Sequence, residues 1–163
     1  MQDVEFNQLI SQIKDKLFRL SKRLLVSREE AEDATQEVLS KLWDRRSELA
    51  QYGNMEAYAL KMAKNYCLDQ LKSKRAKTSC LACEIVDRDP GIQKRMEDRE
   101  VWQNLERILF SLPEQQRIIF QLRDIEEFDF EIIATVLEMN EVAVRVALSR
   151  ARKTIRSKMI NIE

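Results

Sequence analysis

Histidine is absent from this chain, and glycine and proline each occur only twice among its 163 residues. Without histidine, the protein lacks the commonest general base, the usual zinc ligand and any serine–histidine or cysteine–histidine nucleophile pair. Glycine-rich phosphate loops are missing too, and the carboxylates form no recognisable catalytic constellation. Strand-rich folds need frequent turns, yet the residues that make turns are scarce. The sequence therefore predicts an all-α protein that is not an enzyme.

Cysteine is also rare, with Cys67, Cys80 and Cys83 only. Three cysteines cannot complete a disulfide framework, so they fit a reduced, cytosolic setting. Cys80 and Cys83 have CxxC spacing, which is half of a zinc site, and no histidine exists to complete it. We expect no metal or other cofactor. A reversible disulfide between the two remains open, although incidental cysteines are the favoured interpretation.

Long apolar runs are missing as well, and residues 132–137 are among the longest. This is far below the length that crosses a bilayer. The first residues, MQDVEFNQ, have neither a basic start nor an apolar core and are not typical of a signal peptide. We expect a cytoplasmic protein without membrane insertion.

The 28 basic and 28 acidic residues cancel in total but are separated along the chain. Residues 27–37 contain five acids and one base (net −4), and residues 60–77 contain six bases and one acid (net +5). The same order returns in residues 114–141, with eight acids and two bases, and in residues 142–160, with six bases and no acid. Two acidic–basic pairs predict two modules, each with one face for a polyanion. Solvated helix faces of random sign are the alternative.

Apolar residues at helical spacing predict three helices in the first half of the chain. The first runs from about residue 4 to residue 25. Ser27 and Glu30 have the spacing of a capping box for the second helix. That helix is expected to bury Ala31, Ala34, Val38, Leu42 and Trp43. After a loop over 47–53, Asn54 caps a third helix that extends to about Lys74.

The segment after Lys74 has no sustained period and ends in Asp-Pro-Gly, which indicates a linker. We therefore predict two small helical domains, 1–77 and 92–163, joined by a flexible linker, 78–91. Asp89-Pro90 can equally begin the next helix, with proline at its first position.

In the second domain, Ser111–Glu114 is predicted to be another capping box. Asp129 is predicted to cap a helix over Phe130–Leu137, and Asn140 to cap a long final helix. These last two helices, separated by Glu138-Met139-Asn140, are typical of a helix-turn-helix.

Projection of the final helix at about 100° per residue separates two faces. One is an apolar stripe that would pack on the preceding helices: Val144, Leu148, Ala151, Ile155 and Met159. Of the other residues, those in the first turns of such a helix reach base edges, and later ones meet phosphates. We assign base readout to Val142, Arg145, Val146 and Ser149. We assign backbone contacts to Arg150, Arg152, Lys153 and Arg156.

The alternative is a solvated basic face on a bundle helix, which the turn, the cap and the absence of acids all disfavour. Arg145 is the favoured bidentate partner of a guanine, a contact worth roughly 1–3 kcal/mol of discrimination.

The third helix is apolar over most of its circumference and leaves a narrow polar stripe. The stripe consists of Lys61, Asn65, Leu68 and Lys72, flanked by Lys64 and Asp69. Lysines beside an amide that can read a base edge suit a single strand. Tyr52, Tyr58 and Tyr66 are candidate stacking platforms, although packing is favoured for Tyr58 and Tyr66.

Three blocks in this order resemble the extracytoplasmic-function (ECF) sigma factors, specificity subunits of bacterial RNA polymerase. SREEAEDATQEVLSKLW (27–43) is similar to the family's region 2.1–2.2, and AYALKMAKNYCLDQLKSKR (57–75) to its region 2.3–2.4. Residues 112–156, from LPEQQRIIF to SRARKTIR, are similar to region 4. The resemblance covers nearly the whole chain.

The resemblance implies a role for each block. Region 2.2 would bind a coiled coil of the polymerase β′ clamp through Asp33, Gln36, Glu37 and Trp43. Region 2.3–2.4 would melt and read the minus-10 element through Lys61, Lys64, Asn65, Asp69, Lys72 and Arg75. The loop 50–54 would shape the pocket for a flipped base. Region 4 would read the minus-35 element with the final helix. The acidic first half of region 4 would face the β flap.

The resemblance thus implies a non-enzymatic initiation factor that binds core RNA polymerase and promoter DNA, is held by an anti-sigma factor, and is a monomer when free. The alternative is a stand-alone dimeric helix-turn-helix regulator of duplex operators. That alternative explains the final helix but leaves the stripe on the third helix and the acidic second helix without a purpose.

The chain departs from the family at several positions. Tyr58 stands where tryptophan is frequent, and Glu127 and Glu138 stand where glycine is frequent. A left-handed backbone at either glutamate would be strained. Ala143 and Val146 replace polar residues of the reading helix. The family's base contacts therefore do not transfer to these two positions, and the promoter sequence stays open.

Overall fold

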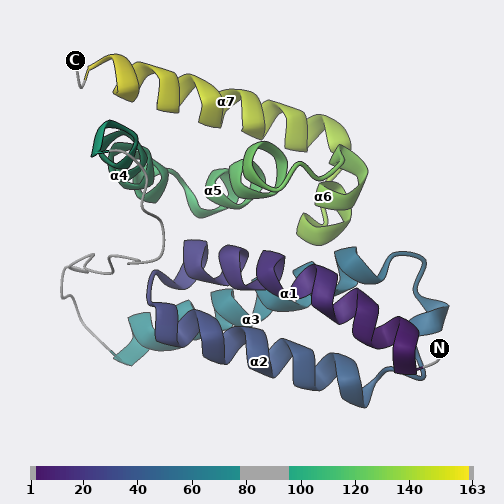
Figure 1. Cartoon of the computed structure of the whole chain (residues 1–163). Helices are drawn as coiled ribbons and strands as arrows, with labels where there is room; N and C mark the ends of the chain where they lie inside the picture. Colours follow the sequence, from purple (N-terminus) through teal and green to yellow (C-terminus); the bar gives the residue numbers. More distant parts are fainter. Residues whose placement is uncertain (1–2, 78–95, 162–163) are drawn as a thin grey trace. The chain divides into compact units, whose positions relative to one another are not determined.

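The computed structural model describes residues 3–77 and 96–161, and all regular elements in these two ranges are helical (Figure 1). The first range contains α1 (Asp3–Leu25), α2 (Arg28–Asp44), the 3-10 helix η1 (Leu49–Gln51) and α3 (Met55–Lys77). The second contains α4 (Met96–Ser111), α5 (Glu114–Phe120), the π-helix η2 (Gln121–Ile125), α6 (Phe130–Leu137) and α7 (Glu141–Ile160). The predicted all-α class is confirmed.

The chain divides into two compact units: the first is built on α1–α3 and also takes in Thr135–Glu138, and the second is built on α4, α5, α7 and the first part of α6. The predicted linker 78–91 lies outside the described residues, together with Cys80, Cys83 and the alternative helix start at Asp89-Pro90.

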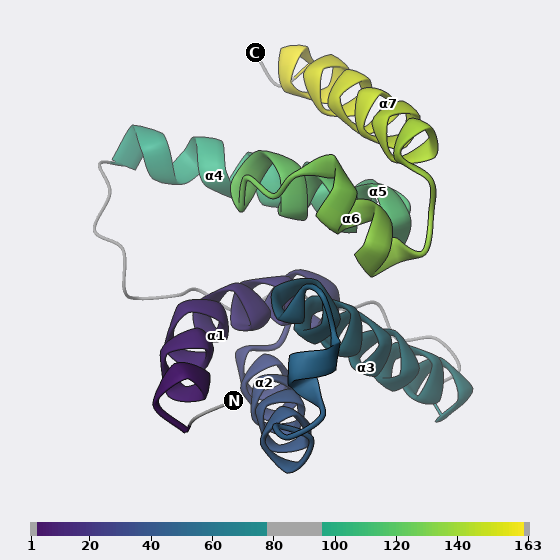
Figure 2. The ribbon, with the colours of Figure 1, turned by 90° about the vertical axis from the view of Figure 1, so that its right-hand side faces the viewer.

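In the first unit, α1, α2 and α3 pack against one another, as two views at right angles show (Figures 1 and 2). Large aliphatic side chains fill the centre and are fully buried: Ile13, Leu17, Leu20, Leu24, Leu49 and Leu60. Each such side chain contributes about 1.5–3 kcal/mol relative to an exposed one. Small side chains on α2 and α3 let the helix axes approach closely: Ala31, Ala34, Ala57, Ala59 and Ala63 are almost completely buried.

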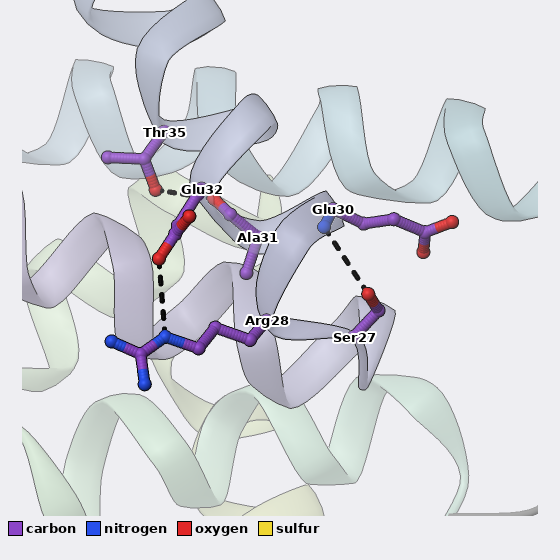
Figure 3. Close-up of polar contacts among 6 residues, drawn as sticks. All are labelled: Ser27, Arg28, Glu30, Ala31, Glu32 and Thr35. Atoms are coloured by element: carbon purple, nitrogen blue, oxygen red, sulfur yellow. Dashed lines mark hydrogen bonds and ion pairs between the residues drawn. The ribbon is translucent and has the colours of Figure 1, made fainter. Parts of the chain in front are cut away.

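The start of α2 follows the prediction only in part. The Ser27 hydroxyl oxygen accepts a hydrogen bond from the Glu30 amide at 3.4 Å (Figure 3). The reciprocal half of the capping box is wrong, because the Glu30 carboxylate points away from Ser27 and pairs with Lys74 of α3. Glu30 therefore ties α2 to α3 instead of capping its own helix. The predicted cap of α3 is confirmed, since the Ala57 amide donates to Asn54 Oδ1 at 3.0 Å.

Trp43 lies on the surface, which overturns the expectation that α2 buries it. Its side chain is 43% exposed, whereas the neighbouring Leu42 is buried. Leu42 is the last residue of the apolar stripe of α2. Because successive helical residues are about 100° apart, Trp43 lies outside this stripe. The ring meets the Phe6 ring edge-on at a centroid distance of 5.6 Å, and the Arg46 guanidinium lies 4.3 Å from its centroid.

The second unit has its own core, in which α7 packs against α4 and α5. Leu109, Leu112 and Ala151 form one buried cluster, and Leu105, Phe120 and Ile155 pack around it. The predicted capping box at Ser111–Glu114 is wrong, because α5 begins after Pro113 without a side-chain cap. The Ser111 hydroxyl instead donates to the Ile108 carbonyl at 2.6 Å and accepts from Lys158 Nζ at 2.5 Å.

Three residues other than glycine have a left-handed backbone: Val26 (φ 70°), Glu127 (φ 61°) and Glu138 (φ 56°). The sequence pointed to the two glutamates, because the resembled family often has glycine there. Val26, which turns the chain between α1 and α2, was missed, and a β-branched residue is especially disfavoured in this conformation. Each of these turns therefore stores backbone strain that glycine would relieve.

Replacement of Glu127 by glycine is expected to raise the free energy of unfolding by roughly 1 kcal/mol. The gain is the relief of the left-handed strain, reduced by the conformational entropy that glycine adds to the unfolded chain. Glu127 is exposed, so no packing is lost. Urea denaturation measures the change. Glu127→Ala removes the same charge but keeps Cβ and is expected to give no gain. Equal stabilisation by both variants would assign the effect to charge and contradict the backbone explanation.

Cys67 is a free, fully buried thiol on α3. Burial raises its pKa from 9.0 to about 11. Because the folded pKa exceeds the unfolded one, the resulting stabilisation is complete below pH 9 and is lost as the pH rises towards 11.

Between pH 8 and pH 10, wild type should therefore lose about 1 kcal/mol more stability than Cys67→Ala does. Denaturant titrations of both proteins at the two pH values measure this difference. Parallel losses would mean that the thiol does not titrate differently in the folded and unfolded chains.

Candidate nucleic-acid interface

The structure forms the predicted helix-turn-helix from α6 and α7. The α6 bounds match the prediction, and Asn140 caps α7, since its Oδ1 accepts a hydrogen bond from the Ala143 amide at 2.7 Å. The turn between the two helices uses the left-handed Glu138, after which the Met139 amide donates to the Ala134 carbonyl at 3.0 Å. Backbone hydrogen bonds and one asparagine thus fix where α7 begins.

The predicted division of α7 into two faces is confirmed. On the apolar side, Val144, Leu148 and Ala151 are buried, and Ile155 and Met159 are half-buried. All eight residues assigned to DNA contact are exposed: Val142, Arg145, Val146, Ser149, Arg150, Arg152, Lys153 and Arg156. Val142 is 71% exposed and Val146 is 44% exposed. Two valines open to solvent beside arginines give this end of α7 an apolar and a cationic part, both of which base edges can use.

Arg152 is tied within its own unit. Its Nε donates to Asp124 Oδ2 at 2.9 Å, and its Nη2 pairs with Asp124 Oδ1. This bidentate pair raises the pKa of Arg152 above its ordinary value. Arg152 therefore holds α7 against η2 through two of its donors and has fewer left for a phosphate.

Arg145, two helical turns earlier, has a different environment. Its guanidinium carbon lies 4.1 Å from the centroid of the Phe130 ring, at the start of α6. The Arg123 guanidinium lies 4.4 Å from the same centroid, and its Nη1 donates to the Phe128 carbonyl at 2.9 Å. Sequence reasoning missed Phe130, because an aromatic residue at the start of a short apolar helix is typical of a core position.

The π-helix η2 supplies the residues that reach α6 and α7. It is marked by the hydrogen bond from the Glu126 amide to the Gln121 carbonyl at 3.0 Å, which spans five residues. The wider turn shifts the helical register, and Arg123 and Asp124 from this turn contact Phe130 and Arg152. No periodicity in the sequence signalled this change of register.

On α3, the six residues assigned to the minus-10 element differ in exposure. Asn65, Asp69, Lys72 and Arg75 are exposed, whereas Lys61 is half-buried. Lys64 is buried, and this desolvation lowers the pKa of its amine. The four exposed residues form the part of this set that is open to a nucleic acid.

The tyrosines near the start of α3 form a small surface cluster. The Tyr52 and Tyr58 rings stack at a centroid distance of 4.5 Å and an interplanar angle of 16°. Arg45 Nη1 donates to the Tyr58 hydroxyl oxygen at 3.0 Å. Tyr52 is 43% exposed, while Tyr58 and Tyr66 are half-buried. The favoured packing role of Tyr58 thus takes the form of a stacked pair next to the loop 50–54.

The acidic helix α2 presents the four residues expected at a protein interface. Asp33, Gln36, Glu37 and Trp43 are all exposed on this helix. Across residues 3–77 and 96–161, no three potential metal ligands come together, and none of the helices there is long and apolar enough to span a membrane.

Comparison with protein families places two models on the chain. The model described as Sigma-70 region 2 matches residues 9–77, and the model described as Sigma-70, region 4 matches residues 102–155. The first match covers α1 from residue 9 onwards, together with α2 and α3. The second covers most of α4, then α5, η2 and α6, and α7 as far as residue 155.

Two curated relatives are similar over most of the chain. The ECF RNA polymerase sigma-E factor of Haemophilus influenzae is 31% identical over 94% of this chain and 87% of its own length. The ECF RNA polymerase sigma factor SigE of Mycolicibacterium smegmatis is 30% identical over 93% of this chain, which spans 60% of that protein.

Two solved structures have the same fold. The sigma factor RpoE of Bartonella quintana, crystallised with the anti-sigma factor NepR, matches with a TM-score of 0.82 and 20% identity over 95% of this chain and 96% of that one. CnrH, solved with the cytosolic domain of CnrY, matches with a TM-score of 0.73 and 16% identity over 99% of this chain and 92% of that one.

Proposed function

This chain belongs to the ECF sigma factors, and from that premise we propose that it binds core RNA polymerase and directs promoter recognition, promoter melting and transcription initiation. The observation that carries the proposal furthest is the exposed cationic face of α7, without an acid from residue 142 to residue 160, on a capped helix-turn-helix. A cationic face with two exposed valines suits the major groove of duplex DNA. In this proposal the chain has no enzymatic activity of its own.

We propose that residues 1–77 are region 2, that 78–91 are the linker, and that 92–163 are region 4. Region 2 contacts the minus-10 element as a single strand through Lys61, Lys64, Asn65, Asp69, Lys72 and Arg75. The proposal is supported by the exposure of four of these side chains. Lys64 is the weakest member, since a buried amine must be uncovered before it can meet a phosphate.

Region 4 reads the minus-35 element with α7. Val142, Arg145, Val146 and Ser149 lie in its first turns and meet base edges in this proposal. Arg150, Arg152, Lys153 and Arg156 meet the DNA backbone. Each module offers few phosphate contacts, so the free protein binds DNA weakly, and tight binding needs both modules joined on polymerase.

The exposed residues of α2, Asp33, Gln36, Glu37 and Trp43, are the proposed contact with the β′ clamp, and the acidic half of region 4 faces the β flap. An acidic helix face is the complement of a basic partner surface. An anti-sigma factor is a further proposed partner, by analogy with the similar RpoE structure, which was solved with the anti-sigma factor NepR. We expect the free protein to be a cytoplasmic monomer.

Run-off transcription with core RNA polymerase over a pool of genomic promoters tests the function. Addition of the chain should produce transcripts from a defined subset of promoters, and the chain should co-purify with core polymerase. A stable dimer that binds duplex operators tightly and has no affinity for core polymerase would instead support the stand-alone regulator.

A further inference from the structure

We propose that Phe130 is a positioning residue for base recognition: its ring holds the Arg145 guanidinium at the start of α7, ready to meet a base edge. The inference rests on the proposed function, in which Arg145 reads a base pair of the minus-35 element. Phe130 itself belongs to α6, and it acts through the 4.1 Å contact between its ring centroid and the guanidinium carbon.

The kind of contact matters, because it decides which hydrogen-bond donors of the arginine stay available. An aromatic ring attracts a cation through its negative face and takes up none of the five N–H donors as a strong hydrogen bond. Asp124 shows the contrast, since it engages Nε and Nη2 of Arg152. In the described part of the chain, no carboxylate pairs with Arg145, and Glu141, one turn earlier, does not reach it.

The ring is itself held in place. Phe130 is half-buried at the first position of α6, and a second guanidinium, that of Arg123, lies 4.4 Å from its centroid. Arg123 is anchored in turn by its 2.9 Å hydrogen bond to the Phe128 carbonyl. The π-helix therefore supports the ring, and the ring supports Arg145.

Restraint of Arg145 before binding favours recognition. A long arginine side chain loses rotamer freedom when it enters the groove, and a side chain that is already oriented loses less. Charge on α7 alone gives non-specific attraction to phosphates. An oriented guanidinium discriminates between bases at a single base pair. A freely rotating guanidinium would discriminate more weakly there.

The test uses holoenzyme assembled from core RNA polymerase and the full chain, with the duplex that wild type enriches from a library randomised in the minus-35 region. The base pair at which Arg145→Ala loses its preference is identified first. Discrimination is then the ratio of two affinities, that for the enriched duplex and that for the same duplex with this base pair replaced. Phe130→Leu removes the ring but keeps an apolar side chain, and Phe130→Tyr keeps the ring. Thermal unfolding shows whether each variant folds.

Phe130→Leu should reduce discrimination at that base pair by about three- to fivefold, and Phe130→Tyr should leave it unchanged. In an Arg145→Ala background, Phe130→Leu should have no further effect. The positioning role would be overturned if Phe130→Leu left discrimination unchanged, or if it reduced discrimination equally in the wild-type and Arg145→Ala backgrounds. Arg145 would remain the reader in either case. If Arg145→Ala alters no base preference, the reader assignment fails as well, and the positioning role with it.

Discussion

Replacement of Arg145 by alanine should cut transcription from promoters with a defined minus-35 element by between about fivefold and about 150-fold. The range follows from the roughly 1–3 kcal/mol that a bidentate arginine–guanine contact contributes. Arg145 is exposed in the second turn of α7, and its contact with Phe130 leaves its N–H donors available. Run-off transcription on matched promoters, one with its minus-35 guanine replaced, measures the effect.

Arg156→Ala is the matched control, because Arg156 is an exposed arginine on the same helix that we assign to the DNA backbone. Loss of a phosphate contact should weaken binding almost equally on all sequences and reduce the salt dependence by about one unit of slope. Core polymerase binding should be intact in both variants. If Arg145→Ala weakened core binding as much as transcription, α7 would be mainly structural at this position.

The double variant Lys61→Ala and Lys72→Ala should impair open-complex formation, and a pre-melted template should restore activity. Both lysines lie on α3 within one stripe, with Lys72 exposed and Lys61 half-buried. They would hold the backbone of the opened strand, so their loss weakens the melted state more than the closed one. The expected reduction in open complex is about tenfold at moderate salt, and the salt slope should fall by about 1.4, which is about 0.7 for each lost phosphate contact on a single strand. Permanganate footprinting of the minus-10 region measures it.

Lys14→Ala serves as the control for lost positive charge, because Lys14 is exposed on α1 and lies outside the proposed interfaces. It should leave open-complex formation unchanged. A defect of the double variant that persists on the pre-melted template would place the two lysines in a step other than strand capture.

Local features of the chain were predictable because they depend on residues close in sequence. The apolar spacing that predicts α6 gives its bounds correctly, and Asn54 and Asn140 cap the helices that follow them. An exposed cationic face opposite Val144, Leu148 and Ala151 follows from helical geometry alone.

Two of the failures share a cause, which is competition from residues far away in sequence. Glu30 has the spacing of a capping box, yet Lys74, 44 residues later, takes its carboxylate. Ser111 bonds back to Ile108 and accepts from Lys158, 47 residues later, so it does not cap α5. Trp43 was assigned to the core, but the apolar stripe of α2 ends at Leu42. For Glu30 and Ser111, local propensity was a weak prior that tertiary partners overrode.

The sequence by itself determined that the chain is helical, where most of the helices begin, and that α7 has one apolar and one cationic face. These properties follow from residue spacing and composition. Only the tertiary structure decided which arginine of that face is paired with a carboxylate and which keeps its N–H donors available. Arg145 and Arg152 are two turns apart and equally charged, so the sequence cannot tell them apart. The π-helix brings Asp124 to Arg152, and α6 brings an aromatic ring to Arg145. A carboxylate occupies the donors of an arginine, whereas a ring leaves them available.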